Sequence, residues 1–199
     1  MRIPKMAIFP IIFIVLGIVF QGMLRDGITT WMPTYLADIH EMSNEKSIFS
    51  AIFPAIFSII TFSLANLLYK KFFTNEVVCG AVIFGVATIA AAIFIMFGTS
   101  KIVAIVCFTL ITGCMHGINL MLITHVPKRF KKYGNISTVS GVINACSHVG
   151  AAIFTYGIAV LSERIGWQWT VGVWVLLALL GATVCLIAAG HWKQMADAE

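Results

Sequence analysis

The sequence predicts an all-α membrane protein with six transmembrane helices, and three observations support that fold class. The 199 residues are 60% hydrophobic and 11% charged, with a mean hydropathy of +0.97, whereas soluble domains carry about 25% charged residues. The apolar residues form six separate runs, and each is long enough for a helix to cross a bilayer core of about 30 Å. The runs lack the alternating polar and apolar residues of an outer-membrane β-barrel strand.

The six runs form a single predicted domain over residues 1–199, because short loops join them and no soluble segment or low-complexity linker separates them. The predicted spans are residues 7–36, 47–68, 77–97, 102–124, 137–161 and 169–189. The first run follows a basic start, as in a signal peptide, but it is too long for a typical signal and no Ala-x-Ala-like cleavage site follows it. We therefore interpret it as a retained first helix.

The basic residues predict how the helices are oriented. Nine lysines and arginines lie at the N-terminus, in the tail and in the loops after spans two and four, against three in the other loops. Because cytoplasmic loops of membrane proteins are rich in Lys and Arg, both termini are expected in the cytoplasm. The protein is thus expected to be multi-pass in the plasma, or inner, membrane, and its net charge of +5 does not indicate nucleic acid.

Several other classes of protein are not supported by the sequence. No hydrolase, metalloprotease or nucleotide-binding motif is present, so we predict no catalytic residues and no enzyme activity. The five cysteines lie in or at the ends of apolar runs without a Cys-x-x-Cys pair. They therefore predict packing residues, with no disulfide framework, metal site or cofactor.

Arg25 is the most informative residue, because it continues an almost wholly apolar helix. A cation at the centre of a membrane helix costs at least about 2.5–3.5 kcal/mol and usually faces a cavity or a partner. Trp31 and Tyr35 resemble the aromatic belt at the outer interface, which would place Arg25 some two turns deeper. A cavity-facing Arg25 is the preferred interpretation, and a side chain that extends to the interface is the alternative.

The neighbours of Arg25 are expected to divide between two faces of the helix. Gln21 and Thr29 lie four residues to either side of Arg25, so they share its face and could line the same cavity. Asp26 is adjacent in sequence and is therefore expected to point elsewhere.

Two further spans carry polar residues. Asn144 and His148 lie one turn apart in the fifth span, where they predict either a polar stripe along a substrate pathway or hydrogen bonds between helices. His116 and Asn119 lie in the fourth span, where the histidine could relay a proton or serve as a structural hydrogen-bond partner. These four residues, with Arg25, Gln21 and Thr29, form the predicted substrate-binding set.

Small residues and a basic loop predict contacts at the helix surfaces. Gly113 and Gly117, and separately Ser137, Gly141 and Ala145, recur at four-residue steps, a spacing that lets helix backbones approach closely. The basic loop at 128–132 is expected to fix the topology and to touch anionic lipid headgroups, with a specific lipid site as an alternative.

Residues 24–36, with Arg25 before Gly27 and then Trp31, Pro33, Thr34, Tyr35 and Leu36, resemble the seventh helix of the organophosphate:phosphate antiporters. These transporters of glycerol 3-phosphate and hexose phosphates belong to the major facilitator superfamily. Residues 113–122, 127–161 and 166–167 resemble the tenth helix, the following loop and eleventh helix, and the entry to the twelfth. The resemblance covers the whole chain and implies the C-terminal half of a 6+6 fold.

The resemblance also implies a function. In that family an arginine from the first helix and one from the seventh clamp the substrate phosphate, and Arg25 matches the seventh-helix residue. The implied mechanism is alternating access, with two six-helix halves rocking about a midplane site. These six spans supply no second arginine, and residues 68–73 lack the Gly and Asp of the superfamily's usual motif.

Arg25 and the resemblance together predict a half or fragment of a secondary active transporter for a small anionic metabolite, and the resemblance implies an antiporter for a phosphorylated one such as a sugar phosphate. Its expected partners are the lipid bilayer, the substrate or phosphate, and either an N-terminal six-helix half or a second copy of the chain. The alternatives are a homodimeric half-transporter and a membrane sensor or assembly subunit that does not transport.

Overall fold

Long helices make up almost all of the described chain. The computed structural model describes residues 5–133 and 136–197, with side chains over 8–131 and 136–192. In chain order the elements are α1 (Lys5–His40), α2 (Asn44–Ser50), α3 (Ile52–Phe72), α4 (Glu76–Phe97), α5 (Lys101–Asn119), the π-helix η1 (Leu120–His125), the 3₁₀-helix η2 (Val126–Tyr133), α6 (Ile136–Ile165) and α7 (Trp167–Asp197). Six stretches among the described residues are long and apolar enough to cross a membrane, and the predicted all-α fold class is confirmed.

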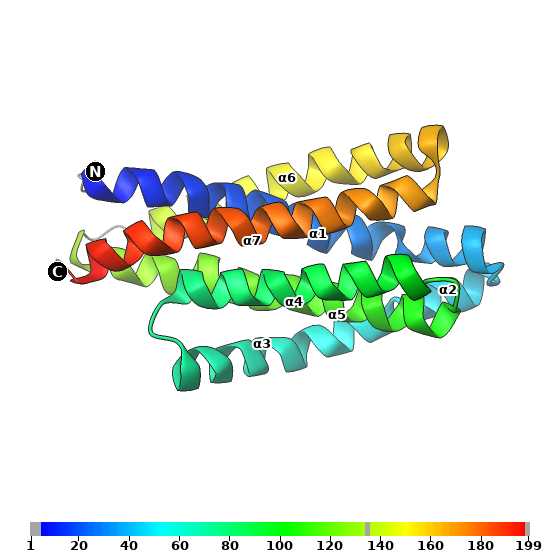
Figure 1. Ribbon diagram of the computed structural model, residues 1–199, viewed down its shortest axis with the longest axis horizontal. Helices are drawn as coiled ribbons and strands as arrows, with labels where there is room; N and C mark the ends of the chain where they lie inside the picture. The colour runs from blue at the N-terminus through cyan, green and yellow to red at the C-terminus, as the bar shows by residue number, and fades with distance from the viewer. Residues whose placement is uncertain (1–4, 134–135, 198–199) are drawn as a thin grey trace.

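The helices lie side by side along one common direction, with both ends of the chain at the same end of the bundle (Figure 1). α1 packs against α6, α7 and α5, while α4 packs against α7 and α5. α3 contacts mainly α5, so α3 and α6 form opposite edges of the bundle (Figure 1). This arrangement places α1, the helix that carries Arg25, between α6 and α5.

α1 is longer than predicted and extends to His40, with Pro10 and Pro33 inside it. Its 36 residues span about 54 Å at a rise of about 1.5 Å per residue, more than the bilayer core of about 30 Å. The helix ends where Glu41 adopts a positive φ of 50°, a conformation that few residues other than glycine take. Arg25 therefore lies near the middle of α1, rather than near its outer end.

The second predicted span is broken into α2 and α3 at Ala51. Pro54 explains the position of the break, because a proline ring clashes with the carbonyl of the residue four positions earlier, which is Ser50. The Ala51 amide instead donates to the Ile48 carbonyl at 3.1 Å. Hydropathy could not reveal this break, since both sides of it are apolar.

The fourth span also departs from a regular α-helix, because α5 passes into the π-helix η1 and then the 3₁₀-helix η2. Pro127 lies just beyond η1 and has no amide hydrogen, so it cannot donate to the Ile123 carbonyl four residues earlier. The Ser140 hydroxyl of α6 donates to that carbonyl at 2.9 Å. A side chain from a neighbouring helix thus replaces the missing backbone donor.

Ser140→Ala is expected to lower the free energy of unfolding by about 0.6 kcal/mol and at most about 1.7 kcal/mol, the average and the maximum measured for hydrogen bonds between membrane helices. SDS titration of the purified protein, followed by circular dichroism, would measure the loss. Ser162→Ala is the matched control, because the Ser162 hydroxyl donates only within its own helix, to Ala159. Equal effects of the two substitutions would contradict the bridging role of Ser140.

The close contacts between helices agree with one small-residue prediction and differ from the other. A Cβ added to Gly113 would lie 2.7 Å from Phe57 of α3, and one added to Gly117 would lie 3.2 Å from Ala65, so α5 and α3 do approach closely there. In contrast, Ser137, Gly141 and Ala145 of α6 are exposed.

α6 makes its close approach to α1 on a different face. A Cβ added to Gly22 of α1 would lie 2.1 Å from the Ser147 carbonyl oxygen, and one added to Gly150 would lie 2.6 Å from that of Val19. The predicted small-residue stripe is therefore an outward face of this bundle, and Gly22 and Gly150 form the actual crossing.

The predicted aromatic belt is also corrected by the structure. Tyr35 is 6% exposed, and its ring packs edge-on against Phe94, Phe108 and Trp167 at centroid distances of 5.3–5.4 Å. Tyr35 therefore belongs to an aromatic core rather than to a surface belt. Trp31 is half-buried, and its indole nitrogen donates to the Thr155 carbonyl of α6 at 2.9 Å.

Candidate functional site

Arg25 is neutralised by its own neighbour in the sequence. Its Nε lies 2.5 Å from Asp26 Oδ1 and its Nη2 lies 2.9 Å from Asp26 Oδ2, a two-point pairing of guanidinium and carboxylate. The expectation that Asp26 points elsewhere is therefore wrong. Although adjacent residues leave a helix in different directions, the long arginine side chain wraps back to the carboxylate, since two unpaired charges in an apolar helix would be costly.

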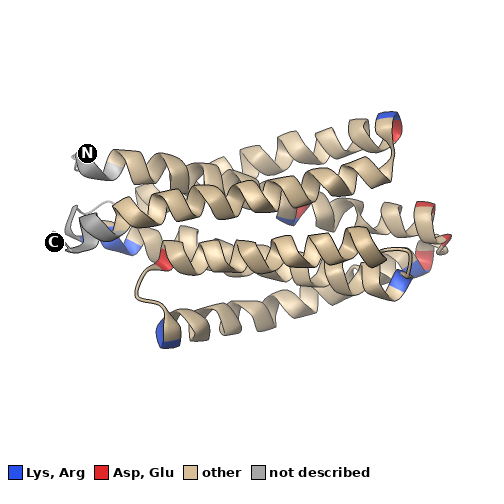
Figure 2. Cartoon of the chain, in the orientation of Figure 1, with Lys and Arg blue, Asp and Glu red and all other residues tan. Residues whose placement is uncertain are grey.

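The pair lies far from both ends of its helix. Arg25 is about 30 Å from the first residue of α1 and about 22 Å from the last, at a rise of about 1.5 Å per residue. Charged residues otherwise gather at the two ends of the bundle, as Figure 2 shows. The Arg25 side chain is 13% exposed and that of Asp26 is 35% exposed, so the carboxylate is the more accessible partner.

Asp26 opens onto a cavity of about 560 Å³ between α1 and α6. The cavity is also lined by Trp31 of α1 and by His148, Thr155 and Tyr156 of α6, with three alanines. The Trp31–Thr155 hydrogen bond ties the two helices together beside this space. A half-exposed carboxylate and an exposed imidazole thus face one open cavity, next to the guanidinium of Arg25.

The remaining predicted residues of α1 lie in unlike environments. Gln21 is 0% exposed; its amide nitrogen donates to the Met115 carbonyl at 2.9 Å and its oxygen accepts from Ser147 at 3.0 Å. Gln21 therefore joins α1, α5 and α6 and is not accessible in this arrangement. Thr29 is exposed, and its hydroxyl donates to the Arg25 carbonyl at 2.7 Å.

The polar residues of α5 and α6 divide in the same way. Asn144 and His148 are exposed on α6, and His148 reaches the cavity. His116 is half-buried on α5, and its Nδ1 donates to the Thr112 carbonyl at 2.9 Å, because a carbonyl oxygen can only accept. Asn119 is the half-buried last residue of α5.

Asp26 pairs with Arg25 and lines the same cavity as His148, so it connects these two predicted residues. Asp26 itself was not among the predicted substrate-binding residues. Trp31, Thr155 and Tyr156 also line the cavity and were likewise outside that set. The sequence could have predicted the role of Asp26, because an acidic residue next to an arginine in a membrane helix can form an ion pair with it. Among the described residues, no group of three His, Cys, Asp or Glu side chains is arranged to hold a metal ion.

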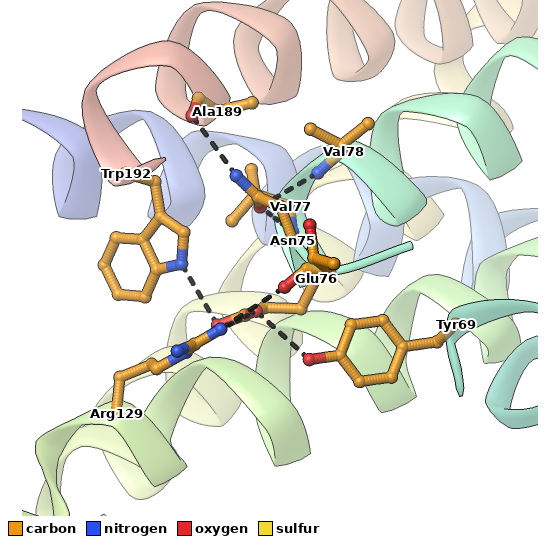
Figure 3. Close-up of polar contacts among 9 residues, drawn as sticks. Tyr69, Asn75, Glu76, Val77, Val78, Arg129, Ala189 and Trp192 are labelled. Atoms are coloured by element: carbon orange, nitrogen blue, oxygen red, sulfur yellow. Dashed lines mark hydrogen bonds and ion pairs between the residues drawn. The ribbon is translucent and has the colours of Figure 1, made fainter. Parts of the chain in front are cut away.

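A second polar cluster lies at the end of the bundle that carries both termini (Figure 3). Glu76, at the start of α4, is 0% exposed, and its two oxygens accept from Arg129 Nε and Nη2 at 3.1 Å each. The Trp192 indole donates to Glu76 at 3.0 Å and the Tyr69 hydroxyl at 3.4 Å. The cluster connects α3, α4, η2 and α7.

This cluster was not predicted from the sequence, in which Arg129 is one of several cations in a basic loop that was expected to lie at the surface. Glu76 lies 53 positions earlier in the chain and follows a polar turn, where an acid normally faces water. Asn75 caps α4 by accepting from the amides of Val77 and Val78. The capping residue thereby fixes the start of the helix from which Glu76 projects inward.

Comparison with known proteins assigns the fold to a family. The family model described as Major Facilitator Superfamily matches residues 2–155. A crystal structure of an auto-inhibited POT family peptide transporter is similar over 90% of this chain and 37% of that chain, with a TM-score of 0.74 and 16% identity. The chain therefore spans a little more than a third of that transporter's length.

A comparison with curated proteins gives no match. The family match agrees with the prediction of a transporter-type membrane protein rather than an enzyme. The family model covers most of the chain, and the described residues form six helices long enough to cross a membrane, so the chain belongs to the Major Facilitator Superfamily.

Proposed function

We propose that this chain is a six-helix half of a secondary transporter for a small phosphorylated metabolite, and that Arg25 binds the substrate anion. The observation that carries the proposal is the Arg25–Asp26 pair, which lies in the middle of a membrane helix beside an open cavity. A guanidinium presents a planar fork that fits two phosphate oxygens. Without substrate, Asp26 occupies that fork and neutralises the charge.

Binding then proceeds by exchange of one anion for another. A phosphate ester enters the cavity between α1 and α6, accepts two hydrogen bonds from the Arg25 guanidinium and displaces the Asp26 carboxylate. The phosphate has the advantage in charge, since a phosphate monoester carries about −1.5 to −2 at neutral pH against −1 for a carboxylate. The displaced carboxylate remains in the cavity, which His148 also lines.

The other predicted residues take supporting roles in this proposal. Asn144 and Thr29 are exposed near the same region and can contact the non-phosphate part of the substrate. His116 and Asn119 of α5 are proposed to contact the substrate from outside the cavity between α1 and α6, whose lining includes neither residue. Gln21 holds α1, α5 and α6 together one turn below Arg25, so it positions the site without touching the substrate.

A second six-helix bundle completes the transporter in this proposal, either as the other half of the protein or as a second copy. The exposed faces of α1 and α6 around the cavity are where it would dock. We further propose that both termini face the cytoplasm of the plasma, or inner, membrane. Figure 2 shows lysines and arginines at both ends of the bundle and most acidic residues at the end away from the termini, so the end with the termini is the more basic one, which supports that orientation.

The test is phosphate-ester exchange by the complete transporter in proteoliposomes, with labelled substrates. Arg25→Ala is expected to lower the apparent affinity at least about 100-fold, because a bidentate charged contact is lost. Arg25→Lys keeps the charge but not the fork and is expected to cost about tenfold. Arg164→Lys, at the exposed end of α6, is the matched control, and unchanged exchange in Arg25→Ala would refute the proposal.

The Asp26→Asn variant tests whether the substrate displaces the Asp26 carboxylate from Arg25 or whether Asp26 instead supports Arg25 in binding. With the competing carboxylate removed, phosphate esters are expected to bind about tenfold more tightly, while Arg25→Ala binds more weakly. Equilibrium binding to the purified transporter would show this difference. Equal losses in Asp26→Asn and Arg25→Ala would mean that Asp26 supports Arg25 and is not displaced.

A homodimeric half-transporter differs from a 6+6 transporter in one measurable respect. Two copies of this chain would place two Arg25 side chains across one cavity, so crosslinking in membranes should give dimers of the chain. Saturable ligand binding without flux into vesicles would instead favour a sensor or assembly subunit.

A further inference from the structure

A second basic cavity lies far from Arg25, at the end of the bundle that carries the termini. It has a volume of about 450 Å³ and lies between α3 and the turns η1 and η2. Its polar lining consists of Ser63, Asn66, Lys70, Thr124, His125 and Lys128. Each of these side chains can donate a hydrogen bond, and two of them are permanent cations at neutral pH.

Among the side chains that the structure describes, no acid pairs with the lysines of this cavity. Among the described residues, neither Lys70 nor Lys128 makes an ion pair, since the pairs found are Arg25–Asp26 and Arg129–Glu76. Glu76 is fully buried and accepts hydrogen bonds from Arg129, Trp192 and Tyr69. Glu76, the acid at this end of the bundle whose side chain the structure describes, is therefore already paired, and the two lysines of the cavity have no described acidic partner.

The local backbone explains how these donors come together. η1 is a π-helix. This form is rare in proteins, but where it occurs it is often at a functional site. η1 carries Thr124 and His125, and Lys128 follows three residues later. The His125 ring packs against Tyr69 with a centroid distance of 4.7 Å, and neither ring nitrogen has a hydrogen-bond partner among the described residues. The ring is thus held in place with its polar atoms unused.

The surroundings of the cavity indicate where its ligand comes from. Phe62 and Leu120 supply apolar lining beside the polar groups, and α3 continues this apolar surface through the exposed side chains of Ile59 and Leu67. A ligand with a phosphate group and an acyl chain would meet both surfaces, with the phosphate beside the lysines and the chain along α3. Basic pockets between transmembrane helices on the cytoplasmic side are known to bind anionic lipid headgroups.

We propose that this cavity is a binding site for the phosphate group of an anionic phospholipid. The two lysines and His125 hold the phosphate oxygens, the hydroxyls of Ser63 and Thr124 and the amide of Asn66 complete the donor set, and the acyl chain lies along α3. The site is separate from the Arg25 cavity and does not depend on the substrate proposed there, but it rests on the proposed orientation that places this end of the bundle at the cytoplasmic face. A soluble phosphate ester offers the same headgroup chemistry without the chain, so the experiment must distinguish the two.

The test measures binding of fluorescent phosphatidylglycerol to the purified full chain in zwitterionic detergent. Lys70→Gln/Lys128→Gln is expected to weaken binding by about tenfold or more. Lys71→Gln/Lys131→Gln is the matched control, because it removes the same charge from exposed lysines at the same end that do not line the cavity. It is expected to change binding by less than about threefold.

Two further arms make the outcome decisive. Lys70→Arg/Lys128→Arg is expected to restore binding, which shows that the charges act at a formed site and that the glutamine variant did not merely unfold. Inorganic phosphate and glycerol phosphate at millimolar concentration are expected to leave the bound lipid in place. Equal weakening in both glutamine pairs, or displacement of the lipid by these soluble phosphates, would overturn the proposal.

Discussion

Arg129→Met is expected to destabilise the bundle by about 3 kcal/mol, the lower end of the usual cost of leaving one partner of a buried ion pair alone, because the Glu76 side chain is fully buried while that of Arg129 is 36% exposed. The reason is the position of Glu76, which is fully buried and receives two hydrogen bonds from the Arg129 guanidinium. Without Arg129, a carboxylate remains in an apolar region with only Trp192 and Tyr69 as donors. Thermal unfolding in detergent, followed by circular dichroism, would measure the loss.

A double variant separates the stranded charge from the loss of packing. Glu76→Gln/Arg129→Met removes both charges but keeps an amide oxygen that accepts from Trp192, so most of the stability should return. Lys131→Met is the control, since this exposed cation of η2 makes no ion pair among the described residues. A loss below about 1 kcal/mol in Arg129→Met, typical of a surface pair, would show that the pair contributes little.

The number of spans could be predicted from the sequence because hydropathy depends only on the local run of residues. The ends and interruptions of those spans depend on single residues that hydropathy does not register. Pro54 and Pro127 were visible, but their effects lie four residues upstream, at Ser50 and Ile123. The extra length of α1 was hidden because Asp38 and His40 continue the helix into polar sequence.

The sequence predicted Arg25 and His148 as residues of the candidate site, but not the residues that surround them. Arg25 was identifiable because a charge in an apolar run is conspicuous, whereas its pairing with Asp26 depends on how a long side chain bends. The same limit applies to small residues: Gly22 and Gly141 look alike in sequence. Only the arrangement of helices shows that Gly22 meets a backbone oxygen and that Gly141 meets nothing within 4 Å.

Gly22→Ala is expected to lower the free energy of unfolding by about 1–3 kcal/mol, the usual cost of overpacking a close contact. The added Cβ would lie 2.1 Å from the Ser147 carbonyl oxygen, and a backbone atom cannot turn aside as a flexible side chain can. α1 and α6 must therefore separate. The hydrogen bond between Ser147 and Gln21, at 3.0 Å, would be strained at the same point.

Gly141→Ala is the matched control for this crossing, because nothing lies within 4 Å of its added Cβ. Since alanine favours a helix over glycine by up to about 1 kcal/mol, this variant should be as stable as the parent chain or slightly more stable. SDS titration of both variants would compare them. Equal stability of Gly22→Ala and Gly141→Ala would show that the close crossing of α1 and α6 is not required.

The same two variants distinguish contacts within this bundle from contacts with a second one. Gly22→Ala should weaken substrate binding as well as stability, because Ser147 precedes His148 and Gln21 lies one turn from Arg25, so separating α1 and α6 disturbs both sides of the cavity. Gly141 lies on the outward face of α6, where the second bundle is proposed to dock. If that face is an interface, Gly141→Ala should leave the isolated chain stable and still impair flux by the assembled transporter.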